Sequence, residues 1–168
     1  MATRWLTPQE REAWLRFAAV LELLPGVLDA QLSRDEGLTH FDYFALAMLS
    51  EAPHRTLRMT QLAGMTNATL PRLSRVISRL ESEGLVERRP CPQDRRATNV
   101  VLTELGWAKV QHAAPGHVEN VRRNVLDTLT PEQVAQLSAV AAQLLQRLDP
   151  DQRMYDTPAA EPGHEAPE

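Results

Sequence analysis

The stretch LSRVISRLESEGLVERRPCPQDRRATNVVLTELG, residues 73–106, decides the fold of this chain. Its first part, LSRVISRL, has apolar residues at the spacing of one helical face, and Gly84 is typical of a residue that ends a helix. Thr69 is the expected N-cap, because Pro71 then lies in the first turn, where its missing N–H costs no hydrogen bond. A helix is therefore predicted over 69–83. Its second face carries Arg72, Arg75 and Arg79.

Two segments with strand composition follow this helix. They are LVERR, residues 85–89, and TNVVL, residues 98–102. Between them lies PCPQDRRA, residues 90–97, in which Pro90 and Pro92 predict a long hairpin loop. The loop contains arginines and almost nothing apolar, so it is not expected to contribute to a hydrophobic core.

Upstream of this stretch, helices are predicted from their capping sequences. TPQE at residues 7–10 has the capping-box pattern that starts a helix, and Pro25 is expected to kink or interrupt that helix. Thr39 is expected to cap a second helix over about 39–51. A short strand and a small helix over 59–65 complete this part of the chain.

Downstream, Thr103 predicts the start of a long helix that reaches about residue 127, with a bend at Pro115. TPEQ at residues 130–133 is another capping box, and apolar residues at helical spacing follow it. Residues 149–168 contain four of the twelve prolines and little to bury. They are predicted to form a disordered acidic tail.

Charge is distributed unevenly along the chain. The whole sequence has 18 basic and 22 acidic residues, yet residues 55–96 contain nine arginines and only four acids. Arginine-rich genes from GC-rich genomes would explain arginine in place of lysine, but not this clustering. A basic patch on an acidic body suits a polyanion that docks at one face.

Composition narrows the class of protein. Apolar residues make up 43% of the chain, enough for a core, and no run of 18 apolar residues predicts a membrane span. The single cysteine, Cys91, excludes an internal disulfide and favours the reducing cytoplasm. No nucleophile–base pair, glycine-rich phosphate loop or metal-ligand spacing is found, so neither an enzyme, a cofactor nor a metal site is expected.

The order of the predicted elements is that of a winged helix-turn-helix. A major groove about 12 Å wide admits one helix, which needs an apolar face on its own domain and a cationic face outward. An arginine-tipped hairpin suits the narrow minor groove alongside. Residues 69–83 and 88–99 supply these two parts. The expected fold is mainly α with a small β wing.

Four motifs follow one another in the decisive stretch: RLE at 79–81, GLV at 84–86 with Arg88 after it, the D-x-R pattern at 94–96, and LTELG at 102–106. With these motifs, the chain resembles the MarR family of bacterial transcriptional regulators over roughly residues 10–147. The resemblance implies a homodimer that binds a pseudo-palindromic operator in double-stranded DNA, as a ligand-responsive repressor. A protein-interaction adaptor without DNA binding, and a helical protein whose basic patch takes a metabolite phosphate, are the alternatives.

The resemblance also implies a division of the chain. Amphipathic helices over 8–32, 104–127 and 131–148 fit a dimer interface independently, because they offer more apolar face than one small domain covers. The implied parts are an N-terminal dimerisation helix at 1–34, the winged helix-turn-helix lobe at 35–103, C-terminal dimerisation helices at 104–148 and the tail at 149–168.

A set of DNA contacts follows from the same resemblance. Arg96 resembles the wing-tip residue that enters the minor groove, Asp94 the acid that holds it through a charge-assisted bond, and Arg95 a phosphate contact. For Asp94 the alternative is an ordinary turn residue. The helix is expected to place Thr69, Arg72 and Arg75 nearest the base edges, and phosphate contacts are expected from Ser74, Ser78, Arg79 and Arg88.

Three further groups of residues have more than one interpretation. Arg79 is a phosphate contact or the partner of an acid inside its own domain. Cys91 is a redox sensor only if a resolving thiol is available, and this chain has no second cysteine. Relatives commonly bind small aromatic acids between the dimer core and the DNA-binding lobe, and the residues here that either line such a pocket or belong to the core are Trp14, Phe17, Tyr43, Phe44 and Met48.

Overall fold

A computed structural model describes residues 2–92 and 94–154 of the chain. It confirms the expected fold class, mainly α with a small antiparallel sheet. The elements are α1 (Pro8–Glu36), α2 (His40–Glu51), the 3-10 turn η1 (Pro53–Arg55), β1 (Thr56–Arg58), α3 (Met59–Met65), α4 (Leu70–Ser82), β2 (Val86–Cys91), β3 (Asp94–Leu102), α5 (Glu104–Asn124), the 3-10 turn η2 (Leu126–Thr128) and α6 (Pro131–Leu148).

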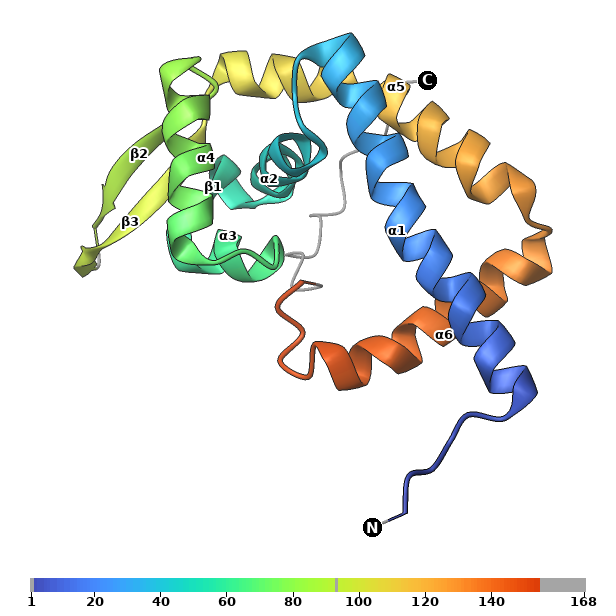
Figure 1. The fold of residues 1–168 in the computed structure, drawn as a ribbon. Coiled ribbons are helices and arrows are strands. Elements are labelled where there is room, and N and C mark those ends of the chain that lie inside the picture. The colour runs from blue at the N-terminus through green and yellow to red at the C-terminus, as the bar shows by residue number, and fades with distance from the viewer. Residues whose placement is uncertain (1, 93, 155–168) are drawn as a thin grey trace.

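One lobe contains α2, α3, α4 and the sheet. The long helices α1 and α5 extend away from it, and α6 runs back so that the chain after it reaches α3 (Figure 1). The sheet has the order β1-β3-β2, with both pairs antiparallel. Val100 at its centre pairs with Leu57 on one side and Arg88 on the other. The hairpin of β2 and β3 runs beside α4, and its tip lies at the end of the lobe where α4 begins (Figure 1).

The hydrophobic core lies between α2, α3, α4 and the sheet, and it receives the C-terminal end of α1 and one face of α5. The predicted apolar face of α4 is part of it, since Leu73, Ile77 and Leu80 are fully buried. Burial of this face fixes which side of α4 turns outward, because the cationic positions lie about a third of a turn away. The sequence pattern thus orients α4 on its own domain.

The predicted helix starts are confirmed. Thr7, Thr39 and Thr130 each form a capping box. The threonine hydroxyl accepts the backbone N–H of the residue three positions later, and the side chain of that residue, an acid or amide, accepts the backbone N–H of the threonine. Thr69 and Thr103 cap α4 and α5 with their hydroxyls. These contacts satisfy N–H groups that the first helical turn leaves without partners.

The two internal prolines do not end their helices, contrary to the interruption expected at Pro25. α1 continues through Pro25, and α5 continues through Pro115 to Asn124. A proline removes only one hydrogen bond of the ladder, and the carbonyl it frees on an exposed surface can bond to water. Packing of α1 against α5 and α2 holds the rest of the helix in place.

The wing is more regular than the sequence predicted. β2 extends through Pro90 to Cys91, and β3 begins at Asp94, so the predicted loop over 90–97 is mostly strand. Pro90 is accepted because β2 is an edge strand, where a missing N–H costs no ladder bond. The register is irregular between Pro90 and Cys91, which is where the tip begins.

The C-terminal end is described only as far as Met154. Asp149 accepts backbone N–H bonds from Arg153 and Met154, and Arg153 lies against Gly64 of α3. Most of the tail predicted at 149–168 lies outside the described residues. None of the described helices is long and apolar enough to span a membrane.

Candidate nucleic-acid interface

The N-terminal half of α4 presents polar and cationic side chains to solvent. Thr69 accepts the backbone N–H of Arg72 in a cap contact of 3.4 Å and is itself exposed. The Arg72 guanidinium lies over the Phe41 ring, 4.4 Å from its centroid. The Arg75 guanidinium is exposed and has no ion-pair or hydrogen-bond partner among the described residues. Arg75 is therefore available to a ligand that approaches α4.

Arg88 joins the wing to α4. Its guanidinium pairs with Glu81 at 2.8 Å and donates to the Ser74 carbonyl at 2.8 Å and to the Ser78 hydroxyl at 2.9 Å. The Glu81 carboxylate also accepts the backbone N–H of Arg88 at 2.8 Å. Arg88 therefore bonds to two other residues predicted as phosphate contacts, Ser74 and Ser78, and these bonds fix the hairpin on the flank of α4.

The wing tip contains an ordered turn. The Asp94 carboxylate accepts the backbone N–H of Arg96 at 3.0 Å, rather than holding the guanidinium. Such a bond shapes the local backbone and so directs the Arg96 side chain, which is exposed. The side chain of Arg95 lies outside the described residues.

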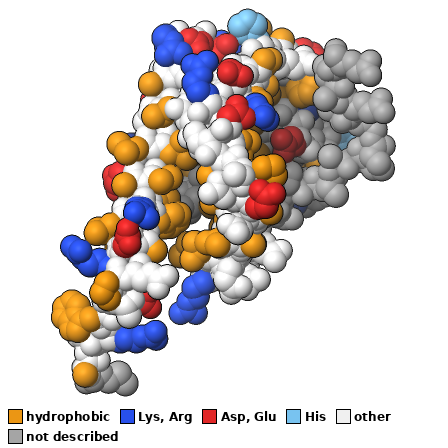
Figure 2. All heavy atoms as spheres, turned by 90° about the vertical axis from the view of Figure 1, so that its right-hand side faces the viewer, with side chains coloured by type: hydrophobic (Ala, Val, Ile, Leu, Met, Phe, Trp, Pro, Cys, Tyr) orange, Lys and Arg blue, Asp and Glu red, His pale blue; other side chains and the backbone are white. Residues whose placement is uncertain are grey.

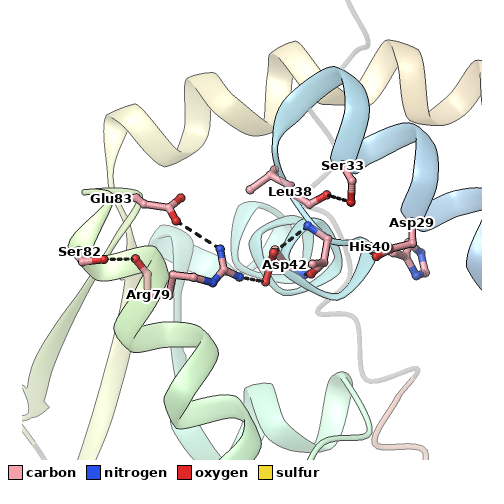
Figure 3. Close-up of polar contacts among 9 residues, drawn as sticks. Asp29, Ser33, Leu38, His40, Asp42, Arg79, Ser82 and Glu83 are labelled. Atoms are coloured by element: carbon pink, nitrogen blue, oxygen red, sulfur yellow. Dashed lines mark hydrogen bonds and ion pairs between the residues drawn. The ribbon is translucent and has the colours of Figure 1, made fainter.

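Arg79 has a different environment from the other helical arginines. Its guanidinium pairs with the carboxylate of Asp42, which is only 1% exposed, and with Glu83 at 3.2 Å. The side chain therefore points across the lobe towards α2 and lies between two carboxylates (Figure 3). Of the two interpretations of Arg79, the pairing with an acid inside its own domain is the one that matches its position.

The structure divides the candidate pocket residues into two groups. Trp14 and Phe17 are 54% and 42% exposed on the first half of α1, which extends away from the lobe (Figure 1). Tyr43 is buried in α2, with Phe44 and Met48 half-buried beside it. The two groups do not come together within one chain.

Several residues that organise the interface were not singled out in the sequence. Asp42 looks like an ordinary helical acid, and Glu81 is recognised only as a member of the RLE motif. Nothing in their spacing indicates their arginine partners. Gly106 belongs to the LTELG motif, but the motif does not show what this glycine does. A Cβ atom there would lie 2.1 Å from the Leu85 carbonyl oxygen, so glycine allows α5 to approach the start of β2. Thr103 stabilises this contact between α5 and β2, because its hydroxyl donates a hydrogen bond to the Gly84 carbonyl at 2.7 Å.

Two histidines lie at the junction of α1, α2 and α5. The His40 ring stacks on Phe44 and on His117, with centroids 6.4 and 5.9 Å apart, and Tyr43 lies 4.6 Å from His117. Burial lowers the pKa of both histidines, and the proximity of His40 lowers the pKa of His117 further. The carboxylate of Asp29 opposes the decrease in the pKa of His40.

A capped helix with an outward cationic face, an arginine hairpin fixed to its flank and a supporting short helix define a winged helix-turn-helix protein. Comparisons with known proteins agree with this class. Residues 38–98 match the model of the MarR family. The repressor YetL of Bacillus subtilis is 27% identical over 112 residues, and the repressor MprA of Escherichia coli is 24% identical over 119 residues. These alignments cover 67% and 71% of this chain, but only 66% and 67% of those proteins.

Solved structures are more similar. Sco3205, a MarR family regulator from Streptomyces coelicolor solved in complex with DNA, is 41% identical, with a TM-score of 0.85 and coverage of 94% of this chain and 97% of that one. AbsC, a MarR family regulator from the same organism, is 40% identical, with a TM-score of 0.82 and coverage of 87% and 98%. This chain belongs to the MarR family of transcriptional regulators.

Proposed function

We propose that this protein is a homodimeric transcriptional regulator that binds a pseudo-palindromic site in double-stranded DNA. The observation that carries the proposal is the joint geometry of α4 and the wing. The hairpin runs beside α4, with its tip at the end of the lobe where α4 begins (Figure 1), and Arg88 holds the two elements together. Arg75 on α4 and Arg96 on the hairpin are both exposed. A helix and a hairpin so placed fit a major groove and the adjacent minor groove.

Within this proposal, the expected contacts have different tasks. Thr69, Arg72 and Arg75 meet base edges, and Arg96 enters the minor groove beside a phosphate contact from Arg95. Arg88 positions the wing through its bonds to Ser74 and Ser78. These two serines face the phosphate backbone. The structure of Sco3205, which is similar over 94% of this chain and was solved in complex with DNA, supports DNA binding by this fold.

The homodimer is supported by apolar side chains that this chain leaves uncovered. α6 buries none of its residues, and the first half of α1 is exposed along its length. Figure 2 shows hydrophobic side chains gathered on the side of the molecule where these helices lie. Monomers rarely expose apolar surface on this scale. The large exposed apolar side chains are Trp14, Leu15, Phe17, Val20, Leu21, Leu23 and Val27 on α1, and Leu137, Val140, Leu144 and Leu148 on α6.

Repression, a response to a small aromatic acid and a cytoplasmic location complete the proposal. A dimer of this kind represses when its site overlaps a promoter, and a ligand regulates it by changing the distance between the two copies of α4. The names of YetL and MprA as repressors support the first point. The half-buried Phe44 and Met48 near the junction of lobe and long helices support the second.

Fluorescence anisotropy tests the central claim. The wild-type protein is titrated into a labelled random-sequence duplex at several salt concentrations. We expect binding that weakens steeply with salt, because each neutralised phosphate contributes a slope of about −0.9 in log K against log salt. A protein-interaction adaptor would show no salt-sensitive binding, and that result would refute the proposal.

A further inference from the structure

A continuous set of polar contacts connects α1 to α4 through the N-terminus of α2 (Figure 3). Asp29 of α1 accepts the backbone N–H of His40 at 2.9 Å. Beside it, Thr39 and Asp42 form the capping box of α2, with bonds of 3.1 and 2.7 Å. The second oxygen of the Asp42 carboxylate pairs with Arg79 on α4. Each step joins two groups that are fixed in secondary structure.

Asp42 is the central member of this set. Its side chain is almost completely buried, and both carboxylate oxygens have partners, one in the backbone N–H of Thr39 and one in Arg79. A buried carboxylate without its counter-charge is strongly destabilising. Arg79 is therefore the counter-charge of the buried Asp42 carboxylate, and α4 is held where that pairing is possible.

Arg79 itself is poorly suited to contact DNA. One side of its guanidinium pairs with Asp42 and the other with Glu83, so its charge is already compensated. A phosphate contact needs a cation whose binding releases counterions from DNA. Arg75, one turn earlier and exposed, has no such partner among the described residues. The two arginines therefore differ in chemistry although they lie on one helix.

We propose that Arg79 is a positioning residue, which sets the placement of α4 through Asp42 and does not contact DNA. This inference rests on the DNA-binding function proposed above. The contact also connects α4 to α1 through the bond between Asp29 and His40, so the orientation of α4 follows the orientation of α1. In a dimer built on α1, this connection relates the two copies of α4 to each other.

The test compares Asp42→Asn, Arg79→Gln and the double variant. Asparagine keeps the shape of Asp42, and its amide oxygen can still accept the Thr39 N–H, but it removes the charge that holds Arg79. Two DNA probes are used. The first is the duplex that wild-type protein selects from a random pool; it has about 30 base pairs, so that it spans two half-sites. The second is a poly(dI-dC) duplex of similar length. Binding is measured well below the unfolding temperature of each variant, so that loss of folded protein does not contribute.

A positioning role predicts a specific pattern. Each single variant should bind the selected duplex about tenfold more weakly, and the double variant no more weakly than the weaker single, because both changes break one contact. Binding to poly(dI-dC) should change less than about twofold, with the salt slope unchanged. A loss of discrimination without loss of electrostatic binding is not what general destabilisation produces.

A phosphate contact predicts the opposite pattern and would overturn the inference. Asp42→Asn would then release the Arg79 guanidinium and bind both duplexes as well as wild type or better. Arg79→Gln would weaken both duplexes equally and reduce the salt slope by about 0.9. Additive losses in the double variant would also overturn it.

Two controls keep the result interpretable. If a single variant does not fold, the double variant decides alone, because it leaves neither the buried carboxylate nor the guanidinium without a counter-charge. For the inference to stand, that variant has to bind the selected duplex more weakly than wild type and bind poly(dI-dC) as well as wild type does. If wild-type protein shows no salt-sensitive binding to either duplex, the proposed function fails before the variants are compared.

Discussion

At the scale of single residues, the environment of a side chain decides its task more than its type does. Arg75 and Arg79 are identical residues one turn apart on α4. Arg75 remains exposed, while Arg79 lies between the carboxylates of Asp42 and Glu83. The helical pattern could place both on a cationic face, but it could not show that Asp42, from another helix, meets only one of them.

Arg75→Ala is expected to relax sequence preference. If its guanidinium bonds to a guanine, the variant should lose about 1–3 kcal/mol of discrimination at that base pair. The measurement is competition binding with duplexes substituted at single positions. Arg123→Ala removes the same charge from the exposed end of α5 and should leave preference unchanged. A variant at Arg75 with wild-type preference at every position would remove it from the set of base contacts.

Gly106→Ala is expected to destabilise the fold. The new methyl group would lie 2.1 Å from the Leu85 carbonyl oxygen, which is backbone and cannot move aside cheaply. We expect a loss of about 1–3 kcal/mol in the free energy of unfolding, the usual effect of overpacking. Gly26→Ala in α1 is the matched control, because nothing lies within 4 Å of its new methyl group. Urea unfolding at equal protein concentration compares the two, and equal stabilities would contradict the explanation.

At the scale of elements, the wing shows how packing extends what local sequence suggests. Pro90 and Pro92 predict a loop, yet β2 continues to Cys91 because it pairs on one side only. The bonds from Arg88 to Glu81, Ser74 and Ser78 then attach this hairpin to α4. Helix and wing therefore form one rigid surface, and neither element would have a defined position without the other.

Arg96→Ala is expected to weaken DNA binding across sequences. If Arg96 meets phosphates in the minor groove, its loss should flatten the dependence of log K on log salt by about one unit. Titrations of one duplex at four salt concentrations measure the slope. Arg58→Ala, which removes an exposed arginine of β1, is the comparison. An unchanged slope and affinity at Arg96 would show that the wing tip does not touch the duplex.

At the scale of the whole molecule, the long helices determine how far one chain can be stable alone. α1 and α6 expose apolar side chains that the lobe does not cover, and α1 is tied to α5 by Glu36, which bonds to Lys109 at 2.9 Å and His112 at 3.0 Å. Burial tends to raise the pKa of Glu36, but these two bonds outweigh it and lower the pKa. This contact fixes the direction in which the apolar faces point.

Leu137→Glu is expected to dissociate the proposed dimer. Each interface would lose two buried leucines, at about 2 kcal/mol each, and would have to bury two carboxylates as well. Sedimentation at micromolar concentration should show a monomer. Gln146→Glu adds the same charge on another face of α6 and should leave the dimer intact. A dimer that survives Leu137→Glu would place the interface elsewhere.

Stability is expected to fall as the pH decreases from about 7.5 to 5.5. The folded-state pKa values of His40 and His117 lie below the ordinary value of about 6.5, so the unfolded chain binds more protons in this range. The contribution of the two neutral histidines to the free energy of unfolding is complete above the ordinary pKa of about 6.5, and it is lost as the pH falls below that pKa. His117 has a buried Nδ1 without a partner among the described residues, so a proton there gains no acceptor.

Urea unfolding at each pH measures this effect. The variant His40→Asn with His117→Gln cannot take up these protons, so its stability should change less over the same range. A wild-type protein that becomes more stable on acidification would contradict the sign of both pKa shifts.

The sequence by itself determined the local structure and the class of protein. Capping threonines, apolar periodicity and the arginine cluster are properties of neighbouring residues, so the helices, the wing and the cationic face of α4 could be predicted. The tertiary structure alone decided which charges face one another. Asp42 meets Arg79 across 37 positions of the chain, and Glu81 meets Arg88 because a strand folds back on α4. Such pairings depend on how elements pack, and no local pattern of residues encodes them.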